Sequence, residues 1–81
     1  MNQQEIKKII VEEKLIRINW FNENQLGENQ VGIKKDGNRW IVYVTDERAN
    51  IVEGSTLLLD NEEEAYEILL RKGIYAKRIF G

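Results

Sequence analysis

The chain has 81 residues, and its 12 basic and 14 acidic side chains give a formal net charge of −2. This near balance argues against nucleic acid or an anionic membrane surface as a partner, because both attract a basic excess. The absence of cysteine excludes disulfides, and the absence of histidine removes the usual general base and the commonest metal ligand. No apolar run approaches the ~20 residues of a membrane span. We expect one domain, residues 1–81, in a reducing cytoplasm and with no membrane partner.

A helix is predicted over residues 3–13. Asn2 can cap it, and Glu5 follows three residues later, at the spacing of a capping box. Apolar side chains then recur at helical spacing: Ile6, Ile9 and Ile10. One side of this helix should therefore be buried, while its charged side meets water.

A first strand is predicted over residues 15–21, where the pattern changes from helical spacing to alternation. Its two faces would carry Ile16, Ile18 and Trp20, and Leu15, Arg17 and Asn19. The polar residues 22–29 indicate a loop of modest length that leads into the next element.

Residues 31–45 predict the central β-hairpin of the fold. Asp36-Gly37 is a strong hairpin signal, because a type I′ turn needs positive φ at both central residues. A two-residue turn at this position sets Val31 opposite Val42. A three-residue loop with a bulge is the competing geometry, and it would set Val31 opposite Ile41 instead. The first register is preferred because it pairs apolar with apolar side chains along the ladder.

The alternation in this hairpin defines two faces. The face expected to be buried consists of Val31, Ile33, Trp40, Val42 and Val44. The opposite face consists of Gln30, Gly32, Lys34, Arg39, Ile41 and Tyr43. This second face is mixed enough to meet solvent or a partner, since exposed apolar groups on a sheet face can mark a binding site.

The next segment is strand-like over residues 51–53 and 56–59, and Gly54 indicates a bulge or a break between the two parts. The inward parity is open. If Glu53 points outward, Val52 lies in the core.

A second helix follows, capped by Asp60 or Asn61. Its first turn carries Glu62, Glu63 and Glu64, and Arg71 and Lys72 would lie in its last turn, as the helix dipole favours. Gly73 is predicted to end this helix as a left-handed C′ residue, with Ile74 folding back onto Leu69. Residues 75–80 would form a short extra strand or a packed tail.

The predicted fold class is α+β, with the element order α-β-β-β-β-α. Hairpin connections predict an antiparallel sheet, and the two amphipathic helices need its apolar face to bury their stripes. Both helices should therefore pack on one face of the sheet.

The residue types argue against an enzyme. The chain has a single serine, Ser55, and neither cysteine nor histidine to act as nucleophile or base. The acids between Asp60 and Glu67 are explained by helix capping, and they lack the central glycine of a calcium loop. We therefore expect no catalytic residues, no metal and no cofactor.

The general layout is similar to that of double-stranded-RNA-binding domains. Those domains place a lysine-rich helix start against phosphates. Here the corresponding helix start is Glu62-Glu63-Glu64, which would repel phosphate. RNA binding is therefore a poorer interpretation than protein binding.

From Lys35 onward the chain resembles small immunity proteins of bacterial polymorphic-toxin systems. The likeness is carried by residues 36–37, 40–43 and 46–48, and by Asp60-Asn61-Glu62-Glu63-Glu64-Ala65-Tyr66. The resemblance implies a non-catalytic protein that binds a cognate protein toxin in the cytoplasm and blocks it. The contacts expected on this basis are Tyr43 as an aromatic anchor, with Asp46, Glu47, Glu62, Glu63 and Glu67. The alternative is a small interaction module, phage-borne or self-associating as a homo-oligomer through the Ile41/Tyr43 face.

Overall fold

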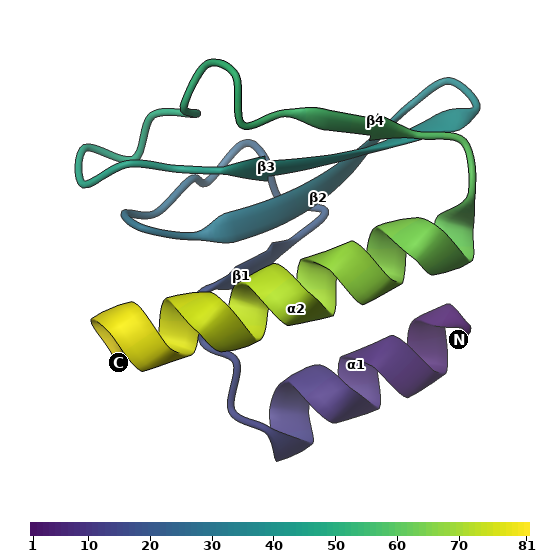
Figure 1. The fold of residues 1–81 in the computed structure, drawn as a ribbon, viewed down its shortest axis with the longest axis horizontal. Helices are drawn as coiled ribbons and strands as arrows, with labels where there is room; N and C mark the ends of the chain where they lie inside the picture. The colour runs from purple at the N-terminus through teal and green to yellow at the C-terminus, as the bar shows by residue number, and fades with distance from the viewer.

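The computed structural model describes residues 1–81, and it has the predicted α+β fold and element order (Figure 1). The elements are α1 (Gln3–Glu12), β1 (Ile18–Trp20), β2 (Val31–Asp36), β3 (Arg39–Val44), β4 (Leu57–Leu59) and α2 (Glu62–Phe80). The strands lie in the sheet in the order β1-β2-β3-β4. Both helices contribute to one core on the same side of the sheet, as the amphipathic stripes predicted.

The sheet is mixed, so the prediction of a wholly antiparallel sheet is wrong for one pair. β2–β3 and β3–β4 are antiparallel, whereas β1 pairs in parallel with β2, with Ile18 opposite Val31 and Trp20 opposite Ile33. Parallel neighbours need a connection that crosses back over the sheet. Residues 21–30 form that crossover, and they return the chain to the same end of the sheet at which β1 begins.

The central hairpin forms with a register that differs from both predicted ones. Val31 lies opposite Val44, and Asp36 lies opposite Arg39, so the two-residue loop is Gly37-Asn38. Of these two, only Gly37 has positive φ, at 62°, which suits the first position of a type II′ turn. The shift from the preferred register is two residues, and an even shift leaves each side chain on its predicted face.

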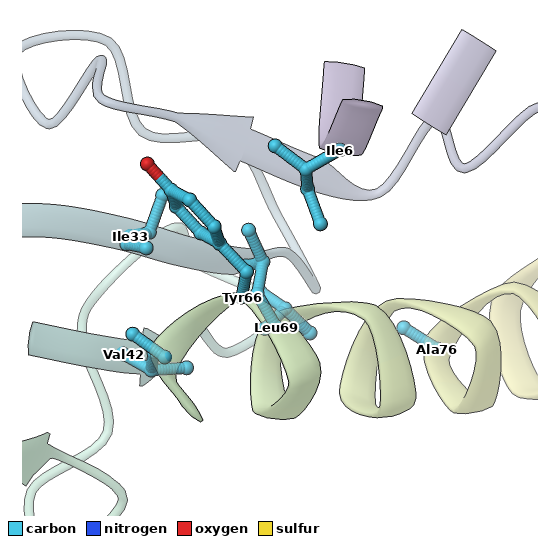
Figure 2. Close-up of a cluster of buried hydrophobic side chains, with 8 residues drawn as sticks. Ile6, Ile33, Val42, Tyr66, Leu69 and Ala76 are labelled. Carbon is cyan, nitrogen blue, oxygen red and sulfur yellow. The ribbon is translucent and has the colours of Figure 1, made fainter. Parts of the chain in front are cut away.

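The core lies between the two helices and the predicted inner face of the sheet (Figure 2). Its buried members are Ile6, Val31, Ile33, Val42, Ala65, Tyr66, Leu69 and Ala76. Trp20 and Trp40 pack against the edge of this cluster, as expected, and the Trp20 ring lies 5.6 Å from that of Tyr66 between centroids. The helix caps also follow the sequence, since the backbone N–H of Glu5 donates to Asn2 Oδ1 at 2.8 Å.

The outer face of the sheet is also covered, which the sequence did not predict. Residues 21–30 fold over part of it and are held there by backbone and side-chain hydrogen bonds. Asn19 Nδ2 donates to the carbonyl oxygen of Gln25 and to Gln30 Oε1, both at 3.2 Å. Thr45 Oγ1 donates to the carbonyl oxygen of Gly27 at 2.7 Å. Ile41 and Tyr43 are buried on this face, so the expectation that they meet solvent or a partner is wrong, whereas Arg39 on the same face is exposed.

The first strand is shorter than predicted: Ile18 and Trp20 pack against the core on one face, as expected, but the residues before them do not continue the alternation. Leu15 and Asn19 are buried, while Ile16 is 71% exposed. Leu15 and Ile16 precede β1, so strand alternation does not extend back to them. The strand-like residues 51–53 contribute only the isolated bridge between Ile51 and Thr45.

Helix α2 does not end at Gly73. It continues to Phe80, so the predicted C′ glycine and the strand or tail over residues 75–80 are wrong. Gly73 faces Ile18, and a Cβ built at this position would lie 2.6 Å from Ile18 Cδ1. The glycine therefore allows α2 to lie close against β1, and Ile74 is exposed instead of folding back.

Candidate functional site

Tyr43 lies on the outer face of the sheet, and its side chain is fully buried. Its ring occupies the space above Gly32 of the neighbouring strand, where a Cβ would collide with it. Burial raises the pKa of Tyr43, and its buried hydroxyl has no hydrogen-bond partner. The prediction that Tyr43 anchors a partner at the surface is therefore wrong, because the ring belongs to the packing beneath residues 21–30.

Asp46 and Glu47 lie in the turn that follows β3. The Asp46 carboxylate accepts hydrogen bonds from the backbone N–H groups of Asn50 and Arg48, both at 2.9 Å. These two bonds lower the pKa of Asp46. Asp46 thus shapes the turn, whereas Glu47 is exposed. This turn lies at the opposite end of the molecule from the start of α2, so the predicted acids do not form one surface (Figure 1).

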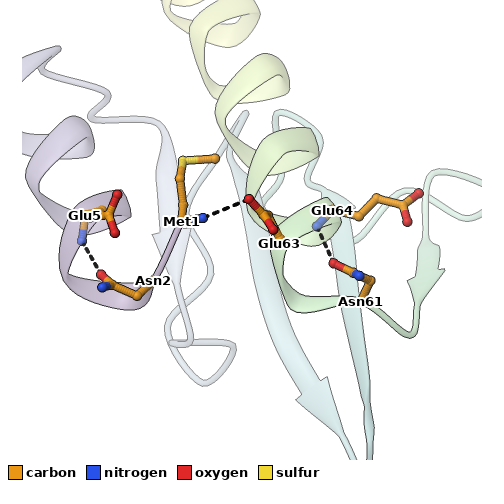
Figure 3. A network of polar contacts seen from close by, with 6 residues as sticks. All are labelled: Met1, Asn2, Glu5, Asn61, Glu63 and Glu64. Atoms are coloured by element: carbon orange, nitrogen blue, oxygen red, sulfur yellow. Dashed lines mark hydrogen bonds and ion pairs between the residues drawn. The ribbon is translucent and has the colours of Figure 1, made fainter.

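The remaining predicted residues lie in the first half of α2. Asn61 caps this helix, and its Oδ1 accepts from the backbone N–H of Glu64 at 2.9 Å. Glu63 pairs with the Met1 ammonium at 3.1 Å, which ties the start of the chain to the start of α2 (Figure 3). The hydrogen bond from Glu63 raises the pKa of the Met1 amino group.

The two helices begin at the same end of the molecule (Figure 1). Their positive dipole ends are therefore neighbours, and carboxylates in the first turns oppose that charge. The residues that do so are Glu5, Glu62, Glu63 and Glu64. The helix dipoles explain why these acids lie in the first turns, as the sequence indicated. Of the four carboxylates, only Glu63 has an ion-pair partner.

Two of the acids remain free for a partner. Glu64 and Glu67 are exposed, and neither has a basic group within 4.0 Å. Asp60, by contrast, lies 3.3 Å from Arg39 Nε, at a solvent-exposed position where such a pair contributes little. Glu64, which was not among the predicted contacts, and Glu67 are therefore the exposed acids in the first half of α2 that have no ion-pair partner, whereas Glu62 is also unpaired but half-buried.

The second half of α2 carries cations and exposed apolar groups. Lys77 Nζ donates to the carbonyl oxygen of Glu13 at 2.7 Å and so ties α2 to the end of α1. Arg71 and Arg78 are exposed and have no carboxylate within 4.0 Å. Tyr75 is 65% exposed between them. Because the helix continues past Gly73, the end of the helix does not explain the position of Arg71.

A signal for this continuation is present in the sequence. Small and apolar residues keep their helical spacing beyond the glycine: Ala65, Leu69, Gly73 and Ala76. A groove of about 310 Å³ lies between this half of α2 and the ends of β2 and β3. Its lining includes Val31, Val44, Tyr75, Ala76 and Phe80, with Lys72 also contributing.

The arrangement presents charge and apolar surface, with no group of three or more carboxylates placed to hold a metal ion. Neither helix combines the length and apolar character needed to cross a bilayer. A comparison of the chain with models of protein families, with curated proteins and with solved structures found no match in any of the three. The interpretation of the surface therefore rests on its own chemistry.

Proposed function

We propose that this chain is a non-catalytic binding protein that neutralises a cognate protein toxin by direct contact in the cytoplasm. The observation that carries the proposal is the unneutralised acidic half of α2. Glu64 and Glu67 lie exposed on a helix that is packed rigidly against the sheet, and no cation of the chain lies within 4.0 Å of them. Such a surface suits the basic cleft of a nuclease or another cationic protein.

Electrostatic complementarity acts mainly on the rate and specificity of association. A rim of like charges raises the association rate for a cationic partner and repels acidic competitors. The predicted contacts Glu62, Glu63 and Glu67 lie in this half of α2, where Glu63 is already paired with Met1, and Glu64 joins them. Asp46 and Tyr43 have structural roles instead, as a turn residue and a buried ring, and they are not part of the proposed contact.

The test begins by searching the genes next to that of this chain for a toxin domain, and it then measures protection and binding with that domain. Glu64→Lys with Glu67→Lys reverses two free acids and leaves the Met1–Glu63 pair intact. We expect the association rate constant to fall by at least about 10-fold at low salt, and protection of growth to be lost.

The matched control reverses two exposed acids elsewhere, Glu28→Lys with Glu53→Lys, and gives the same change of net charge. The control should bind and protect like the parent chain. Equal losses in both variants would show a general charge effect, and retention of binding by the α2 variant would contradict the proposed surface.

A further inference from the structure

The outward side of α2 is divided into two oppositely charged halves. Glu64 and Glu67 lie in the first half, and Arg71 and Arg78 lie in the second, with Tyr75 between the two arginines. At 100° per residue these five positions fall on one side of the helix, opposite the buried Leu69. None of the four charged groups has an ion-pair partner within the chain.

We propose that this stripe is a self-complementary surface that pairs α2 of one chain with α2 of a second copy, antiparallel and related by a two-fold axis. A two-fold contact brings residue i of one copy beside residue j of the other, and j beside i, so each favourable pair occurs twice. An acidic half followed by a basic half meets this requirement only when the helices run in opposite directions.

The charges also fix the position of the axis. An axis through Arg71 would bring two guanidinium groups together, which like-charge repulsion disfavours. An axis between Glu67 and Arg71, near Leu69, places Glu67 beside Arg71 of the second copy. This register forms the Glu67–Arg71 pair twice, and along the helix axis it places Glu64 between Arg71 and Arg78 of the second copy.

The area of such a contact is small. A helix of 19 residues is about 28 Å long, and one helix packed on another buries less than the ~1,200 Å² of a stable interface. The association should therefore be weak, dominated by the ion pairs, and sensitive to salt. The groove beside Tyr75 and Phe80 lies next to the stripe and adds exposed apolar surface.

The pairing does not need a toxin and is measured on the chain alone. Sedimentation equilibrium at low salt should show a concentration-dependent rise from 9.6 kDa toward twice that mass. Salt at about 0.5 M should suppress the rise, because screening then acts over only a few ångströms. A chain that stays at the monomer mass at all concentrations in low salt would overturn the proposal.

Charge swaps test the register. Glu67→Arg alone and Arg71→Glu alone should each weaken dimerisation by about 10-fold or more, since each creates two like-charge contacts. The double variant carrying both changes restores the two pairs and should recover dimerisation to within about 3-fold. All positions are exposed, and thermal unfolding by circular dichroism checks that each variant folds. Unchanged association in the single variants, or no recovery in the double variant, would contradict the proposed axis.

If the toxin contact proposed above also holds, Glu64 and Glu67 are shared, and the toxin and the second copy compete for α2. This corollary rests on the proposed function. A dimer that the toxin does not dissociate would reject the shared surface while leaving self-pairing intact. If the parent chain dimerises but does not bind the toxin, the proposed function fails while the self-pairing stands.

Discussion

The two faces of the sheet are both covered, but by different means. The inner face packs against two helices through apolar side chains. Ile33 of the sheet and Leu69 of α2 are both fully buried in this contact. On the outer face, where Tyr43 and Ile41 are buried, residues 21–30 are anchored by hydrogen bonds of Asn19, Gln30 and Thr45. The first kind of cover is visible in sequence periodicity, and the second is not.

The largest effect is expected on the inner face. Leu69→Ala leaves a cavity between α2 and the sheet, since the leucine side chain is fully buried. The free energy of unfolding should fall by about 3 kcal/mol. Urea unfolding followed by circular dichroism measures it. A loss below about 1 kcal/mol would show that the inner face is loosely packed.

The outer face should respond to added volume. Gly32→Ala places a methyl group where the Tyr43 ring lies, and the chain should lose about 2 kcal/mol. In a Tyr43→Ala background the clash is absent, so the same substitution should have little further effect. Additive losses in this double-mutant cycle would mean that the Tyr43 ring does not lie over Gly32.

The polar cover should depend on single hydrogen-bonding groups. Thr45→Val keeps the shape of the side chain but removes Oγ1, which donates to Gly27 at 2.7 Å and accepts from the Gln30 N–H at 2.8 Å. We expect a loss of about 1–2 kcal/mol and faster amide exchange within residues 21–30. Ser55→Ala is the control, because the Ser55 hydroxyl bonds to Val44 and Val52 and not to residues 21–30, so exchange in that segment should stay unchanged.

The smallest effect concerns alkaline pH. Burial raises the pKa of Tyr43 above its ordinary value of 10.0. Because the folded chain holds the phenol proton more tightly, this stabilisation is complete below pH 10 and is lost as the pH rises through the raised pKa. Tyr43→Phe removes the titration and an unpaired buried hydroxyl, so its stability near neutral pH should equal or slightly exceed that of the parent. If the free energy of unfolding of the Phe variant fell more steeply above pH 10 than that of the parent chain, titration of Tyr43 would not be the cause of the alkaline loss.

The sequence predicted those features that repeat along the chain. The inner face of the hairpin and the caps Asn2 and Asn61 follow from alternation and from the hydrogen-bonding capacity of asparagine. Two glycines misled the prediction. Gly37 occupies the first position of the turn rather than the second, and Gly73 permits close helix–strand packing rather than ending the helix.

The candidate site also has one part that the sequence predicted and one part that it did not. Glu62 and Glu63 lie in the first turn of α2, where the helix dipole favours acids, so the acidic start of α2 was predictable. The burial of Tyr43 was not, because it depends on a polar crossover whose contacts join residues far apart in sequence. The parallel pairing of β1 has the same cause, since no local pattern distinguishes a crossover of residues 21–30 from a hairpin loop.

The central claim is that partners meet the outward side of α2 and not the outer face of the sheet. Hydrogen–deuterium exchange of the chain, alone and saturated with the cognate toxin of the proposed function, tests this most directly. We predict added protection along the first half of α2, around Glu64 and Glu67, with no change in residues 21–30. Protection confined to residues 21–30, or none anywhere in α2, would contradict it.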